Sequence, residues 1–269
     1  MNERRDEFQF QALEVVWLVV FVMLLFVGTA PLFVALGRWA TVPMQVLVLA
    51  GPPVVFVYTR TGTLAAALPA LGVRSANRNT WIGAVLIGLG FWLLSVWLII
   101  PIIERFVDMQ QAEQELRETL KLKQTPLIIT LLTIAVVPAV CEELLLRGAI
   151  ARGLRGSLGL AGALLVSSLL FALMHVDLAR MVPMFAFGLA LGLVTLCSDS
   201  CLPSILIHFI NNAIVLSGDR IPGLNKALIH HPHLAGAIGT AMCLSGLILV
   251  WRARLRPIDD SVVPVTPRD

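Results

Sequence analysis

Residues 81–103 read WIGAVLIGLGFWLLSVWLIIPII, and no charged side chain occurs among them. An apolar run of about 20 residues matches the hydrocarbon thickness of a bilayer when it is helical. Within that hydrocarbon every backbone N–H and C=O needs a partner inside its own segment, so a spanning run of this kind forms a helix. The stretch therefore predicts a transmembrane helix.

The rest of the chain repeats this pattern. Of its 269 residues, 58% are hydrophobic and only 14% are charged, whereas a soluble domain carries about 25% charged residues. Candidate spans lie at 13–36, 42–58, 81–103, 127–146, 158–174, 181–197, 202–216 and 234–251. We predict an all-α, polytopic membrane bundle of about eight transmembrane helices. Pro52 and Pro53 interrupt the second span, which we expect to be kinked or re-entrant.

The organisation outside the spans is simple. We predict one transmembrane domain at 1–256 and a flexible tail at 257–269, which contains three prolines. The mixed-charge stretch 104–124 predicts either an amphipathic helix on the membrane surface or a solvated helical loop. The first apolar run is longer than a signal-peptide core, so we interpret it as a retained span.

Charge predicts orientation and limits the partners. With eight spans both termini share one side, and twelve of the twenty Lys and Arg residues fall on that side. The positive-inside rule then predicts cytoplasmic termini, which we place in the inner membrane of a bacterial cell. The net charge is +3 without a basic block, so no nucleic-acid partner is expected.

Two adjacent carboxylates end the fourth span. Residues 142–147 read EELLLR, in which Glu143 and Arg147 stand four apart and can pair on a helix. Glu142 points about 100° away and has no equivalent partner. Ionisable groups inside a membrane are costly, so the pattern predicts a structural Glu143–Arg147 pair and a Glu142 that is free to act as a base. The alternative is that both glutamates only mark a helix interface.

Two histidines complete a possible site. Glu142 and His175 lie nearly equal distances, roughly 25 Å, from a turn at 155–159 that predicts a helical hairpin. His208 and Asn212 share one helix face, and they meet the first pair only if this hairpin protrudes beyond the next turn. The alternatives are a structural histidine and a polar helix–helix contact.

These residue types suit hydrolysis of an amide. A buried carboxylate beside a histidine can deprotonate a water molecule, and a second donor pair can stabilise the oxyanion that forms. The sequence contains no GxSxG nucleophile motif and no HExxH zinc helix.

The three patterns also resemble a known family. EExxxR at 142–147, FxxxH at 171–175 and HxxxN at 208–212 are similar to the ordered motifs of the CPBP family, the CAAX proteases and bacteriocin-processing enzymes also called ABI. The resemblance covers 135–215 and implies an intramembrane endopeptidase with a four-helix catalytic core at about 127–217. It implies that Glu142 and His175 activate water. It further implies that His208 and Asn212 form an oxyanion hole. The residues that it implies as supporting the site are Glu143, Arg147 and Phe171.

Several alternatives stay open at this point. Zinc could be held by Glu142, His175 and His208; we expect no metal, because Asn212 is a poor zinc ligand but a good oxyanion donor. The expected substrate is a membrane-associated peptide or protein, and the sequence does not choose between maturation, immunity, signalling and tail removal. A small-solute transporter is a rival interpretation, but the sequence shows no repeat of the site in a second half of the chain. A partner-binding scaffold is another, although it would need no buried carboxylate.

Overall fold

The computed structural model describes residues 11–36, 38–106, 114, 118, 124–175, 178–217 and 231–254, and it contains no strand within them. By length and composition, six helices in this part of the chain could cross a membrane. They are Ala12–Leu32, Trp39–Thr61, Arg78–Ile103, Leu127–Leu173, Arg180–Ser198 and Pro232–Ala253. A shorter apolar helix, α12 (Leu202–Ser217), accompanies them.

The longest of these helices is a hairpin rather than one rod. Its first arm contains α8 (Leu127–Thr130), η4 (Leu131–Val136), α9 (Val137–Glu143) and η5 (Leu144–Ala151), and its second arm lies in α10 (Arg152–Leu173). The chain reverses at Gly159, whose φ of 66° and ψ of −176° are accessible almost only to glycine. Because α10 packs back along η5, the hairpin predicted at 155–159 is confirmed. The long apolar helices confirm the predicted helical membrane bundle.

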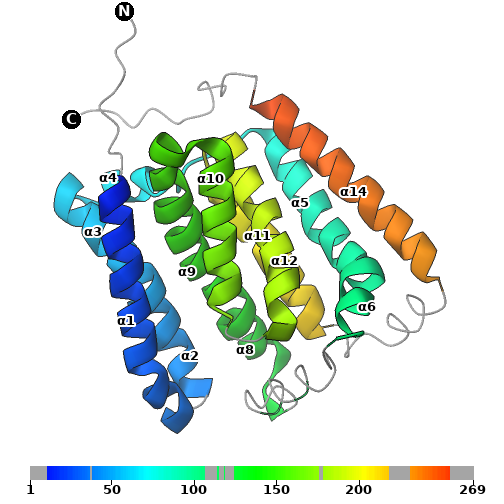
Figure 1. Ribbon diagram of the computed structural model, residues 1–269, viewed down its shortest axis with the longest axis horizontal. Coiled ribbons are helices and arrows are strands. Elements are labelled where there is room, and N and C mark those ends of the chain that lie inside the picture. The colour runs from blue at the N-terminus through cyan, green and yellow to red at the C-terminus, as the bar shows by residue number, and fades with distance from the viewer. Residues whose placement is uncertain are drawn as a thin grey trace, which may run out of the picture.

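The helices run alternately up and down in the bundle (Figure 1). At one side stand α1 (Ala12–Leu36), α2 (Arg38–Met44) and α3 (Gly51–Thr61), and at the other α5 (Arg78–Leu94) and α14 (Pro232–Ala253). The hairpin, α11 (Leu178–Ser198) and α12 lie between them. The start of α1, the end of α14 and α4 (Leu64–Ala70) all lie at the same end of the bundle. This arrangement agrees with an even number of helices that run from one end of the bundle to the other.

Several spans contain wide π-helical turns, and proline explains their positions. The π segments η1 (Gln45–Ala50), η2 (Ser95–Ile99) and η4 are each followed by a proline in the first turn of the next helix, respectively α3, α6 (Ile100–Ile103) and α9. Proline lacks an N–H and its ring clashes with the carbonyl four residues earlier, so the preceding turn widens. The second span is thus a continuous helix with a π segment, which is how Pro52 and Pro53 disturb it.

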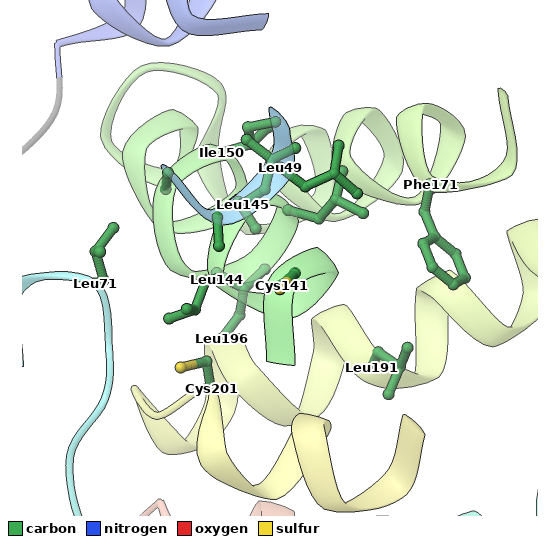
Figure 2. Close-up of a cluster of buried hydrophobic side chains, with 14 of the residues drawn as sticks. Leu49, Leu71, Cys141, Leu144, Leu145, Ile150, Phe171, Leu191, Leu196 and Cys201 are labelled. Atoms are coloured by element: carbon green, nitrogen blue, oxygen red, sulfur yellow. The ribbon is translucent and has the colours of Figure 1, made fainter. Parts of the chain in front are cut away.

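The apolar core holds the hairpin against α11. Figure 2 shows Leu144, Leu145 and Ile150 of η5 in one cluster with Leu191 and Leu196 of α11. All five side chains are less than a tenth exposed. The helix end that carries the adjacent glutamates is therefore held between packed neighbours.

Two predictions concern other parts of the chain. The amphipathic segment predicted at 104–124 lies mostly outside the described residues, and the predicted tail at 257–269 lies wholly outside them.

Candidate active site

The two adjacent glutamates stand at the end of α9, directly before the π segment η5. Glu143 and Arg147 are both fully buried, and Nη1 of Arg147 lies 3.0 Å from Oε1 of Glu143. The ion pair predicted from their spacing is therefore present. Glu142 is also buried, at 8% exposure, but its ionic contact among the described residues is a longer one, of 4.0 Å, to His208.

His208 of α12 reaches both glutamates. Its Nδ1 lies 3.0 Å from Oε1 of Glu143, and its Nε2 lies 4.0 Å from Oε2 of Glu142. Since a carboxylate only accepts hydrogen bonds, the short contact places a proton on Nδ1 of His208. Oε1 of Glu143 thus accepts from both Arg147 and His208, and this one oxygen holds the two side chains.

Arg147 fixes the surroundings of the site as well. Its Nη2 donates to the carbonyl oxygen of Gly188 in α11 at 3.1 Å. Its guanidinium carbon lies 4.6 Å from the centre of the Phe171 ring, a distance at which cation and ring attract each other. The edge-on contacts of Phe171 extend to His175 at 4.9 Å and to His208 at 5.6 Å between ring centres. Phe171 therefore packs against the arginine and against both histidines.

His175 lies at the end of α10 with one ring nitrogen occupied. Its Nδ1 is 2.8 Å from the carbonyl oxygen of Phe171, so it donates there and leaves Nε2 as an acceptor. His175 and His208 both contact the ring of Phe171, and His208 lies 4.0 Å from Glu142. Glu142, His175 and His208 thus come together in one region, from three different helices.

The hairpin protrudes as this meeting requires. Residues 155–161, around its turn, are all exposed. Further down the hairpin, Arg152 pairs with Asp199 in the turn between α11 and α12, at 3.0 Å. The hairpin tip therefore extends beyond the neighbouring turn, which brings Glu142 level with His208.

Asn212 lies one helical turn beyond His208 on the same face of α12. It is half-buried, and the part of the chain that the structure describes offers its side chain no hydrogen-bond partner. Its amide is therefore available to a bound molecule.

One contact of Glu142 was missed by the sequence analysis. Nε2 of Gln45, at the start of η1, donates to Oε1 of Glu142 at 3.1 Å. The available signal was an amide side chain within the apolar run 42–58. No local spacing connects it to a residue 97 positions later.

Glu142, His175 and His208 are also the side chains that the zinc alternative would use as ligands. Within the described residues, no group of three or more His, Cys, Asp or Glu side chains is placed to hold a metal ion. The expectation that the protein uses no metal stays a prediction.

The part of the chain that carries the site matches one family model. Residues 124–214 match the family model described as type II CAAX prenyl endopeptidase Rce1-like, and this range contains all three motifs. Comparisons with curated proteins and with solved structures found no match. The segment that carries the site is thus similar to the Rce1-like type II CAAX prenyl endopeptidases, and the match indicates an intramembrane peptidase of the CAAX type.

Proposed function

We propose that the protein is a glutamate-type intramembrane endopeptidase that cleaves a peptide or a membrane-anchored protein tail with a water molecule activated by Glu142. The observation that carries the proposal is the unequal engagement of two adjacent carboxylates. Glu143 binds Arg147 and His208 at 3.0 Å each, whereas Glu142 accepts one amide hydrogen bond. Glu142 therefore keeps lone pairs to which a water molecule can donate, whereas Glu143 already binds two donors.

The proposed reaction gives each of the four polar side chains a task. Glu142 takes a proton from water while Nε2 of His175 orients that water, and the water oxygen bonds to the carbonyl carbon of the substrate. The electron pair of the C=O bond moves to its oxygen. There the amide of Asn212 donates one hydrogen bond, and Nε2–H of a His208 ring protonated on both nitrogens donates another. When the intermediate collapses, the C–N bond breaks and Glu142 returns the proton to the leaving amine.

The substrate is expected to approach from the face that carries the Asp199 turn. His208 lies six residues after Leu202, the first residue of α12, so the site is about 9 Å below the start of this helix. Arg74, Arg152 and Arg155 gather near the same turn. By the positive-inside rule this face is cytoplasmic, and the substrate would be a membrane-associated peptide presented from the cytoplasm.

Substitution of Glu142 tests the proposal directly. Purified protein in liposomes would be assayed with quenched fluorescent peptides ending in a CAAX sequence, with and without a farnesyl group. Glu142→Ala should abolish cleavage of whichever peptide the parent protein cleaves faster, while the variant stays folded in the bilayer. The matched control is Cys141→Ala, the neighbouring buried residue, which should retain activity. A fully active Glu142→Ala variant would refute the mechanism.

Chelation separates this mechanism from the zinc alternative. Because the proposed steps use no metal, prolonged dialysis against EDTA or phenanthroline should leave the cleavage rate unchanged. Metal content measured on the same sample provides the control. Loss of activity that stoichiometric zinc restores would instead favour Glu142, His175 and His208 as metal ligands.

A further inference from the structure

Gln45 is connected to the site by a single hydrogen bond from a distant part of the chain. It opens η1 in the second span, 97 residues before Glu142 and outside the matched range 124–214. The segment η1 packs directly against α9. His208 lies 4.0 Å from Glu142, which is beyond hydrogen-bond distance. Among the described residues, it is therefore the amide of Gln45 that gives this carboxylate a hydrogen bond and orients it.

The other end of the same amide has no partner. Oε1 of Gln45 is buried and makes no hydrogen bond to any described residue. Buried polar groups in folded proteins are nearly always paired, and leaving one unpaired is destabilising. Here the bonded end is the one that faces the proposed base.

The local backbone also favours a functional role. Gln45 begins a π segment, and π segments occur frequently at functional sites. The wide turn places one additional residue between Gln45 and α3, which changes the direction in which its side chain points relative to a regular helix. Glu142 stands next to the π segment η5, so both partners of this hydrogen bond lie beside irregular turns.

We propose that Gln45 is a positioning residue for Glu142: its amide N–H holds the carboxylate in the orientation from which it takes a proton from water. This inference rests on the proposed function of Glu142. It extends the site beyond the four helices of the hairpin, α11 and α12 to the second span, which the family match does not reach.

The test compares three substitutions at one position. Gln45→Met keeps the approximate shape and removes the donor, Gln45→Glu replaces the donor with an acceptor beside Glu142, and Gln45→Asn keeps a shorter amide. Using the peptide that the parent cleaves faster, Gln45→Met should lower kcat about 10- to 100-fold, as loss of a hydrogen bond to a charged group predicts. KM should change less than about threefold, because the amide acts on the base and not on substrate affinity. Gln45→Glu should lower kcat further, and Gln45→Asn should restore part of it.

Thr41 provides the matched control. It lies one turn earlier on the same helix, and its buried Oγ1 also lacks a partner among the described residues. Thr41→Val should therefore keep the parent kcat, and all variants would be compared for thermal unfolding. A parent-like kcat in Gln45→Met overturns the inference, as does a loss that Thr41→Val reproduces. If Glu142→Ala were fully active, the proposed function would fail first, so the two failures are distinguishable.

Discussion

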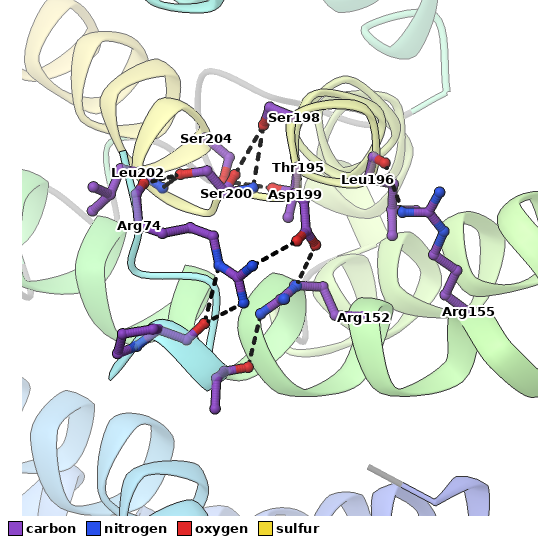
Figure 3. A network of polar contacts seen from close by, with 12 residues as sticks. Arg74, Arg152, Arg155, Thr195, Leu196, Ser198, Asp199, Ser200, Leu202 and Ser204 are labelled. Atoms are coloured by element: carbon purple, nitrogen blue, oxygen red, sulfur yellow. Dashed lines mark hydrogen bonds and ion pairs between the residues drawn. The ribbon is translucent and has the colours of Figure 1, made fainter. Parts of the chain in front are cut away.

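Two ionic clusters of this molecule contain arginine–carboxylate pairs of equal length but lie in opposite surroundings. In the buried cluster, Glu143 and Arg147 lie 3.0 Å apart with side chains that are 0% exposed. In the Asp199 cluster, drawn in Figure 3, Asp199 pairs with Arg74 and Arg152 at the same 3.0 Å while its side chain is 48% exposed. The N–O distance alone therefore says little about how much each ion pair contributes to the stability of the fold.

The remaining contacts show the difference. In the Asp199 cluster, Arg74 also donates to the carbonyl of Pro69 and Arg152 to that of Ala70, which ties the end of α4 to the turn before α12. In the buried cluster, Oε2 of Glu143 and Nε of Arg147 have no partner among the described residues. Buried charges are expensive unless fully paired, so stability alone does not explain the buried cluster. The position of this cluster around Glu142 and His208 explains why it is there.

The largest expected effect comes from breaking the buried pair. Arg147→Ala removes the cation and leaves Glu143 charged in a dry interior, so it should lower the free energy of unfolding by about 3–5 kcal/mol. Unfolding in mixed micelles, followed by circular dichroism, would measure it. Arg155→Ala is the control, because Arg155 is exposed and donates a hydrogen bond to the carbonyl of Leu196 rather than to a buried carboxylate. Equal stability of Arg147→Ala and the parent would contradict the comparison.

The Asp199 cluster should respond far less. Asp199→Asn keeps the shape of the side chain and removes its charge. Partly exposed ion pairs contribute little, so the loss in unfolding free energy should be about 1 kcal/mol or less. High salt should reduce this difference further, since salt screens exposed charges more than buried ones. A loss as large as that of Arg147→Ala would show that the two clusters do not differ in the way their exposure indicates.

The sequence could predict the contacts that local periodicity determines. Spacing of four on one helix predicts the Glu143–Arg147 pair, and equal distances from one turn predict that Glu142 and His175 lie level. Apolar runs of bilayer length predict the helical bundle. Each of these follows from helix geometry and from residues near one another in the chain.

The missed contacts depend on packing between distant segments. Gln45 meets Glu142 only because η1 packs on α9, and Arg147 is held by the backbone carbonyl of Gly188, a group that every residue possesses. The sharing of Glu143 by Arg147 and His208 likewise arises where α12 meets α9. No residue type or spacing in the sequence reports such contacts.

The central claim is that two adjacent carboxylates have different tasks, and a pair of isosteric substitutions tests it most directly. Glu142→Gln and Glu143→Gln would be purified together and measured for kcat on the same peptide and for unfolding temperature. The account predicts that Glu142→Gln loses cleavage while unfolding like the parent, because only its proton acceptor is removed. Glu143→Gln should unfold at a lower temperature, because Arg147 loses its counter-charge. The reverse pattern, with an active Glu142→Gln and an inactive Glu143→Gln of parent stability, would contradict the account.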